Sequence, residues 1–202
     1  MPRIRGANLE EHHAMVWSDL ADALRQLLSE RDYEAINMGH IAARAGLARN
    51  TLYNYAPDKD ALVLALTHRA TRPTVAQVTA VADRSEESAA GRLEEIIDVV
   101  LGMSTDQAMQ LIFRPGGGPP VTEMPHGREN PFREIVVDVQ RVVAEGSARG
   151  EFRRVDDVQL MVELLSGVVR AGAERVSRDP ATFEATARAT REVVLASLVP
   201  RG

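Results

Sequence analysis

The sequence has no cysteine. Its absence excludes a disulfide scaffold, a thiolate zinc site, an iron–sulfur cluster and a cysteine nucleophile. Uncharged apolar runs long enough to span a membrane are also missing. The two arginines near the N-terminus, Arg3 and Arg5, are not followed by the apolar stretch of a secretory signal. The chain is therefore expected to be cytoplasmic, without contact with a membrane.

Aromatic residues and lysine are scarce. Aromatic residues make up 4% of the 202 residues, and Lys59 is the only lysine. The hydrophobic fraction of 45% and the charged fraction of 26% are ordinary for a globular protein. Residues 1–72 hold as many basic as acidic residues, so the net charge of −5 arises in residues 73–202. Residues 36–59 are locally positive, with Arg44, Arg49 and Lys59 against Asp58 alone, which is compatible with a nucleic-acid partner.

Apolar residues recur with helical spacing through most of the chain, and no segment shows the alternation of a strand. The sequence predicts an all-α protein of about nine helices, with a helix-turn-helix domain of three to four helices at residues 1–72 and a larger helical bundle at 73–202. The helix that Asp58 caps is expected to end near Thr71, because Pro73 follows. Residues 114–131 are rich in proline and glycine and are expected to form a loop.

Residues 37–56 show the pattern of a helix-turn-helix motif. Asn37 is a suitable N-cap for a short helix, and Gly46 supplies the positive φ of a tight turn before a second short helix. Ile41, Leu47 and Leu52 are expected to form the core between the two helices. The outward positions of the second helix carry hydrogen-bond donors and acceptors suited to binding base edges and phosphates. These residues are Arg49, Asn50, Asn54 and Tyr55.

Residues 12–66 resemble the DNA-binding domain of the tetracycline-repressor (TetR) family of transcriptional regulators. The residues that carry the resemblance are Glu30-Arg31-Asp32-Tyr33, Ile41-Ala42, Ala45-Gly46, Thr51-Leu52-Tyr53 and Lys59. Three positions depart from the family pattern. Asp32 stands where a glycine is common, but aspartate tolerates left-handed backbone geometry better than most residues. Ala48 stands where a serine or threonine usually caps the recognition helix, and Ala56 stands where a phenylalanine is usual. We expect these departures to make the domain less stable, with the same fold.

The resemblance implies a set of DNA-binding residues. Arg49 and Asn50 would face the major groove, and Asn54 would read a base. The hydroxyls of Tyr53 and Tyr55 would bind phosphates. Lys59 would neutralise a further phosphate. Met38 and Gly39 would approach the DNA backbone. Thr51 is expected to pack or to cap the helix.

The resemblance also implies that the C-terminal bundle binds an effector and forms a dimer. The candidates for pocket lining, which read equally well as plain core, are Met103, Met109, Phe113, Met161 and Leu165. Since the tryptophan and the tyrosines all lie in the first domain, an aliphatic or mixed hydrophobic effector is favoured over a flat cationic one. Helices at about 132–149 and 156–176 carry broad apolar stripes and are expected to pair across a two-fold axis. No cofactor, metal site or catalytic residue is predicted.

The function that the sequence favours is that of a ligand-responsive transcriptional regulator, expected to be a repressor that binds a pseudo-palindromic operator as a homodimer, and not an enzyme. Two alternatives stay open. One is a ligand-independent architectural DNA-binding protein with a filled C-terminal core. The other is an all-α enzyme with a site near the 114–131 loop, although no nucleophile–base pair in the sequence supports it.

Overall fold

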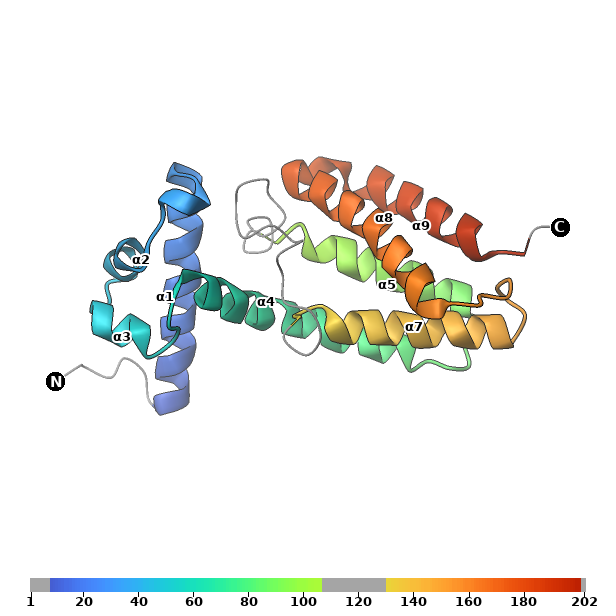
Figure 1. The fold of residues 1–202 in the computed structure, drawn as a ribbon, viewed down its shortest axis with the longest axis horizontal. Helices are drawn as coiled ribbons and strands as arrows, with labels where there is room; N and C mark the ends of the chain where they lie inside the picture. Colours follow the sequence, from blue (N-terminus) through green and yellow to red (C-terminus); the bar gives the residue numbers. More distant parts are fainter. Residues whose placement is uncertain (1–7, 107–129, 201–202) are drawn as a thin grey trace.

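The computed structural model describes residues 8–106 and 130–200, and these residues are helical with short connections. The described part of the chain contains eight α-helices and no strand, which confirms the all-α prediction (Figure 1). None of the described helices has the length and apolar character needed to cross a membrane. The helices are α1 (Leu9–Glu30), α2 (Met38–Arg44), α3 (Arg49–Tyr53), α4 (Lys59–Ala82), α5 (Ala89–Met103), α7 (Arg133–Ala148), α8 (Val158–Arg178) and α9 (Phe183–Leu198), with short 3₁₀ turns η1 (Tyr33–Ala35) and η4 (Pro180–Thr182).

Helices α1 to α3 and the first turns of α4 share one apolar core. Leu20, Ile41, Leu52 and Leu62 are completely buried in it, which confirms the expected packing of the two motif helices, and Leu47 packs against its edge. The side chain of Asp58 caps α4 by accepting a hydrogen bond from the Ala61 amide at 2.8 Å. This core fixes the helix-turn-helix motif against α1.

Helix α4 does not end near Thr71, so that prediction is wrong. The helix continues for 24 residues with Pro73 inside it. Proline removes one backbone hydrogen bond and crowds the preceding turn, but α4 is held on both sides of it. Before Pro73, Leu66 packs on the N-terminal core, and after it Val78 is buried in the C-terminal core. The two cores therefore meet along one continuous helix, and the division at 72/73 stays a prediction.

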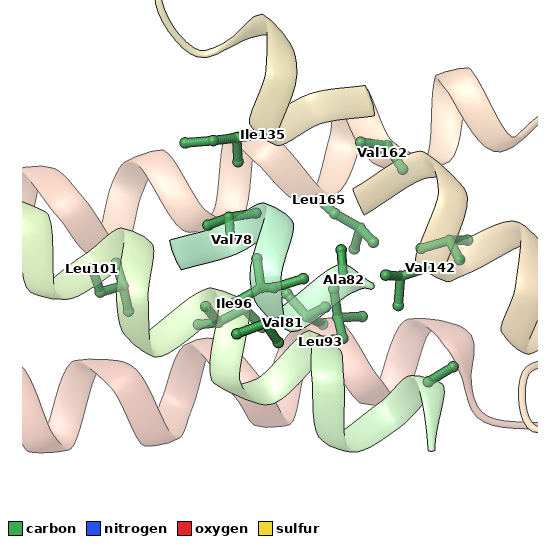
Figure 2. Close-up of a cluster of buried hydrophobic side chains, with 14 of the residues drawn as sticks. Val78, Val81, Ala82, Leu93, Ile96, Leu101, Ile135, Val142, Val162 and Leu165 are labelled. Atoms are coloured by element: carbon green, nitrogen blue, oxygen red, sulfur yellow. The ribbon is translucent and has the colours of Figure 1, made fainter. Parts of the chain in front are cut away.

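The C-terminal core is centred on α5, which contacts α4, α7, α8 and α9. Figure 2 shows the buried side chains of this core, which several helices contribute, among them Val81, Leu93 and Val142. Two glycines permit close contacts. A Cβ atom on Gly146 would lie 2.3 Å from the ring of Phe152, and one on Gly172 would lie 2.9 Å from Thr190 Oγ1. These contacts set the spacing of the bundle.

Two arginines hold the C-terminal end of α4. The Ala82 carbonyl accepts hydrogen bonds from Arg92 of α5 at 2.8 Å and from Arg141 of α7 at 3.2 Å. Arg92 also donates to Glu145 at 2.8 Å, and Arg141 to Asp138 at 2.9 Å. Hydrogen bonding to Asp138 raises the pKa of Arg141. Positive charge at this end complements the helix dipole, so α5 and α7 are both tied to α4.

Candidate nucleic-acid interface and ligand cavity

The turn between α2 and α3 has the geometry that the sequence predicts. The Asn37 side chain accepts a hydrogen bond from the His40 amide at 3.0 Å and caps α2. Gly46 adopts a φ of 66°, and the Leu47 amide donates to the Ala42 carbonyl at 2.9 Å. Helix α3 has no side-chain cap at Ala48, as the sequence indicates. The short α3 is therefore positioned by this turn and by its buried Leu52.

One side of α3 is exposed and polar. Arg49, Asn50 and Asn54 are exposed, and Tyr53 is 43% exposed. The Arg49 guanidinium lies 5.9 Å from the centre of the Tyr53 ring, one turn away. Thr51 is half-buried, which suits the packing role expected of it. The structure thus brings a cationic, an amide and a phenolic side chain together on one short helix.

Tyr55 lies at the end of α3 and packs on α1. Its ring meets Trp17 edge-on with centroids 5.3 Å apart, and His13 lies 5.6 Å away. Arg69 of α4 covers the Trp17 ring at 5.2 Å. Because edge-to-face aromatic pairs are favourable, this cluster anchors α3 against α1 and α4. Tyr55 is half-buried, so it contributes packing as well as a hydroxyl.

Lys59 begins α4 and binds the segment that follows α1. Its Nζ atom donates to the Tyr33 carbonyl at 2.8 Å and lies 3.7 Å from the centre of the Tyr33 ring. The Tyr33 hydroxyl donates to Asp60, and burial together with this carboxylate raises the pKa of Tyr33. An ammonium group has three donors. Lys59 therefore joins η1 to α4 and uses one of its three donors for the Tyr33 carbonyl, and its contact with a phosphate stays a prediction.

The remaining predicted contacts are at the start of α2. Met38 is buried in the N-terminal core and Gly39 is half-buried beside it, so the expected approach of their backbone to DNA stays a prediction. Sequence reasoning missed the pairing of Arg44, which donates two hydrogen bonds of 2.8 Å to Glu30. Arg44 lowers the pKa of Glu30. The positive charge available in residues 36–59 is therefore smaller than composition suggests.

A cavity of about 270 Å³ lies among α5, α7 and α8. Of the predicted pocket residues, Met103 and Leu165 line this cavity, whereas Met161 is a partly buried core residue outside the lining; that they bind a ligand stays a prediction. Met109 and Phe113 lie outside the described residues. Sequence reasoning missed most of the aliphatic wall, including Ile97, Val136 and Val139, because a helical stripe does not distinguish cavity wall from filled core.

Comparison with known proteins identifies similarity in both parts of the chain. Residues 20–66 match the family model described as bacterial regulatory proteins, tetR family. An uncharacterised HTH-type transcriptional regulator of Mycobacterium tuberculosis is 43% identical over 53 residues, and the match spans 26% of this chain and 26% of that relative.

The similarity of fold extends over nearly the entire chain. The fatty acid degradation regulator FadR of Bacillus halodurans aligns with a TM-score of 0.74 at 15% identity, over 96% of this chain and 97% of the other. FadR of Bacillus subtilis, solved in complex with stearoyl-CoA, aligns with a TM-score of 0.71 at 15% identity, over 88% of this chain and 97% of the other. At this identity the structural matches establish the fold.

Proposed function

We propose that this chain, whose residues 20–66 match the tetR family of bacterial regulatory proteins, is a ligand-responsive transcriptional repressor that binds a pseudo-palindromic DNA operator as a homodimer. The observation that carries the proposal is the exposed polar side of α3. Arg49 and Asn50 occupy its first turn, held by a motif whose apolar side is fixed on α1. Arginine reads guanine and asparagine reads adenine in the major groove.

A homodimer follows from the small size of this reading helix. One α3 has too few side chains to specify a site, so two copies placed 34–36 Å apart would read successive half-sites. Helix α8 exposes Leu160 and Leu164 at 51% and 62%, and the adjacent α9 exposes Val193 at 51% (Figure 1). Helix α7 exposes one large apolar side chain, Val137. The interface proposed here therefore includes α8, together with α7 or α9, each of which exposes one large apolar side chain.

The cavity supports regulation by an effector over the ligand-independent architectural alternative, which requires a filled core. Its walls include residues of α5 and α7, the helices whose Arg92 and Arg141 hold the end of α4. A ligand that favours one arrangement of these helices by about 5.5 kcal/mol would shift occupancy from 99:1 to 1:99. The proposed effector is small and hydrophobic, since the wall is mainly aliphatic.

We assign no enzymatic activity, because the relatives matched over residues 20–66 are transcriptional regulators. The enzyme alternative depends on residues 114–131, of which 114–129 lie outside the described part of the chain. A regulator of this kind works beside the chromosome, which is consistent with the expected cytoplasmic location.

Selection of duplexes from a random DNA library by the full-length protein tests the proposal. We expect one enriched site with two-fold symmetry, and Arg49→Ala should reduce the preference for it by about 1–3 kcal/mol per half-site. The matched control is Arg154→Ala, which removes an equal charge from an exposed side chain of the C-terminal domain. Failure to enrich any sequence, or equal effects of the two substitutions, would refute the proposal.

A further inference from the structure

The wall of the cavity among α5, α7 and α8 is aliphatic. Isoleucine, valine and leucine side chains form most of it, and Phe132 is the aromatic residue among the described lining. Aromatic ligands gain from stacking on other rings, which this wall scarcely offers. A cavity of about 150 Å³ accommodates benzene, so in proportion 270 Å³ accommodates roughly ten carbon atoms. The volume and the lining chemistry favour a saturated chain of medium length.

Polar groups line one side of the same cavity, and most of them are already hydrogen-bonded. Glu163 accepts from the Gln159 amide at 3.0 Å, and the Ser166 hydroxyl donates to the Val162 carbonyl at 2.7 Å. The Asn130 side-chain oxygen accepts from the Phe132 amide at 2.8 Å. Within the described part of the chain, the Arg170 side chain has neither an ion pair nor a hydrogen bond, although it also lines the cavity.

Among the described residues that line the cavity, Arg170 therefore carries an unpaired positive charge. A guanidinium has five donors in a planar fork that matches a carboxylate with two parallel hydrogen bonds. Arg170 is exposed to solvent, so its charge is accessible to an entering carboxylate and the pair would be partly screened by water. Resting on the function proposed above, we infer that the effector is a saturated monocarboxylate of roughly ten carbon atoms, with its chain in the cavity and its carboxylate on Arg170.

Calorimetric titration of the full-length protein with decanoate, 1-decanol and decylamine tests this inference. Decanoate should bind at least about tenfold more tightly than 1-decanol, as expected for an added charge-assisted pair, and decylamine should bind most weakly. In the series hexanoate, octanoate and decanoate, affinity should rise about fourfold for each added methylene. Binding of 1-decanol or decylamine as tight as that of decanoate would overturn the assignment of the carboxylate.

Arg170→Gln tests the residue itself. This substitution should abolish the preference for decanoate over 1-decanol and leave the affinity for 1-decanol unchanged, which also shows that the cavity is intact. The control Arg188→Gln removes the same charge from an exposed position of α9 outside the cavity lining and should keep the preference. A preference that survives in Arg170→Gln, or is lost equally in Arg188→Gln, would overturn the inference.

DNA binding is measured separately, without any ligand, on the operator selected above. Operator binding by a protein that fails to bind decanoate overturns the inference and leaves DNA recognition standing. Decanoate binding that requires Arg170 but does not release the operator supports the assignment of the carboxylate to Arg170 and refutes the ligand-responsive part of the proposed function. The two proposals therefore fail by different results.

Discussion

The two partners of the ion pair between Arg92 and Glu145 are unequally buried. This difference predicts which of the two substitutions lowers the free energy of unfolding more. The side chain of Arg92 is 0% exposed and that of Glu145 is 29% exposed. Glu145→Gln leaves a buried guanidinium without its counter-charge, whereas Arg92→Met leaves a carboxylate that water reaches. We expect Glu145→Gln to lower the free energy of unfolding more, although it is the smaller chemical change.

The magnitudes follow from the hydrogen bonds on each side. Removing one partner of a buried ion pair costs about 3–5 kcal/mol, and because glutamine keeps an acceptor we expect about 3 kcal/mol for Glu145→Gln. Arg92→Met loses two hydrogen bonds at about 1 kcal/mol each. The Ala82 carbonyl keeps its bond from Arg141, and methionine keeps an apolar stem in the core. The expected cost of Arg92→Met is therefore about 1–2 kcal/mol.

Urea denaturation followed by far-ultraviolet circular dichroism measures both variants. The fluorescence of Trp17, the single tryptophan, reports separately on the N-terminal core. The double variant should be no less stable than Arg92→Met alone, because the buried guanidinium that Glu145→Gln leaves without a counter-charge is absent from both. The reasoning is refuted if Arg92→Met costs as much as Glu145→Gln, or if the double variant shows additive losses.

Three further substitutions have definite expected outcomes. Ala48→Ser should add the missing N-cap of α3 and stabilise the N-terminal domain by about 0.5–1 kcal/mol, measured by Trp17 fluorescence during denaturation; an unchanged midpoint would contradict it. Gly146→Ala should lower the melting temperature through its clash with Phe152, at a cost of about 1–3 kcal/mol, whereas Gly102→Ala, with open space around it, should not. Leu164→Glu should yield monomers by analytical ultracentrifugation, and a dimer that persists would place the interface elsewhere.

The sequence predicts the helix-turn-helix motif well because its signals are local. Gly46 determines the turn, and Asn37 and Asp58 cap helices within three residues of themselves. Pro73 is equally local but misleads, since packing against two cores outweighs one lost hydrogen bond in α4. The local rule for proline does not include this tertiary packing.

The cavity and the buried charges are harder to predict because they depend on distant partners. Arg92 reads as a surface residue, yet its partner Glu145 lies 53 positions away and the pair is brought together by the packing of α5 on α7. Leu164 and Leu165 are adjacent leucines on one apolar stripe, and one is 62% exposed while the other is 5% exposed. A stripe gives the apolar side of a helix but not which of its edges faces the interior.

The continuity of α4 makes it a lever arm. Its 24 residues rise 1.5 Å each, so the helix is about 36 Å long. Its C-terminal end is gripped by two arginines at the Ala82 carbonyl, and its N-terminal end is packed into the core that holds α3. Over this length a tilt of about 5° carries the far end through an arc of about 3 Å. A hydrogen bond to a base edge is lost over such a distance. A small tilt of α4 at its C-terminal end would therefore move α3 far enough to break its contacts with DNA.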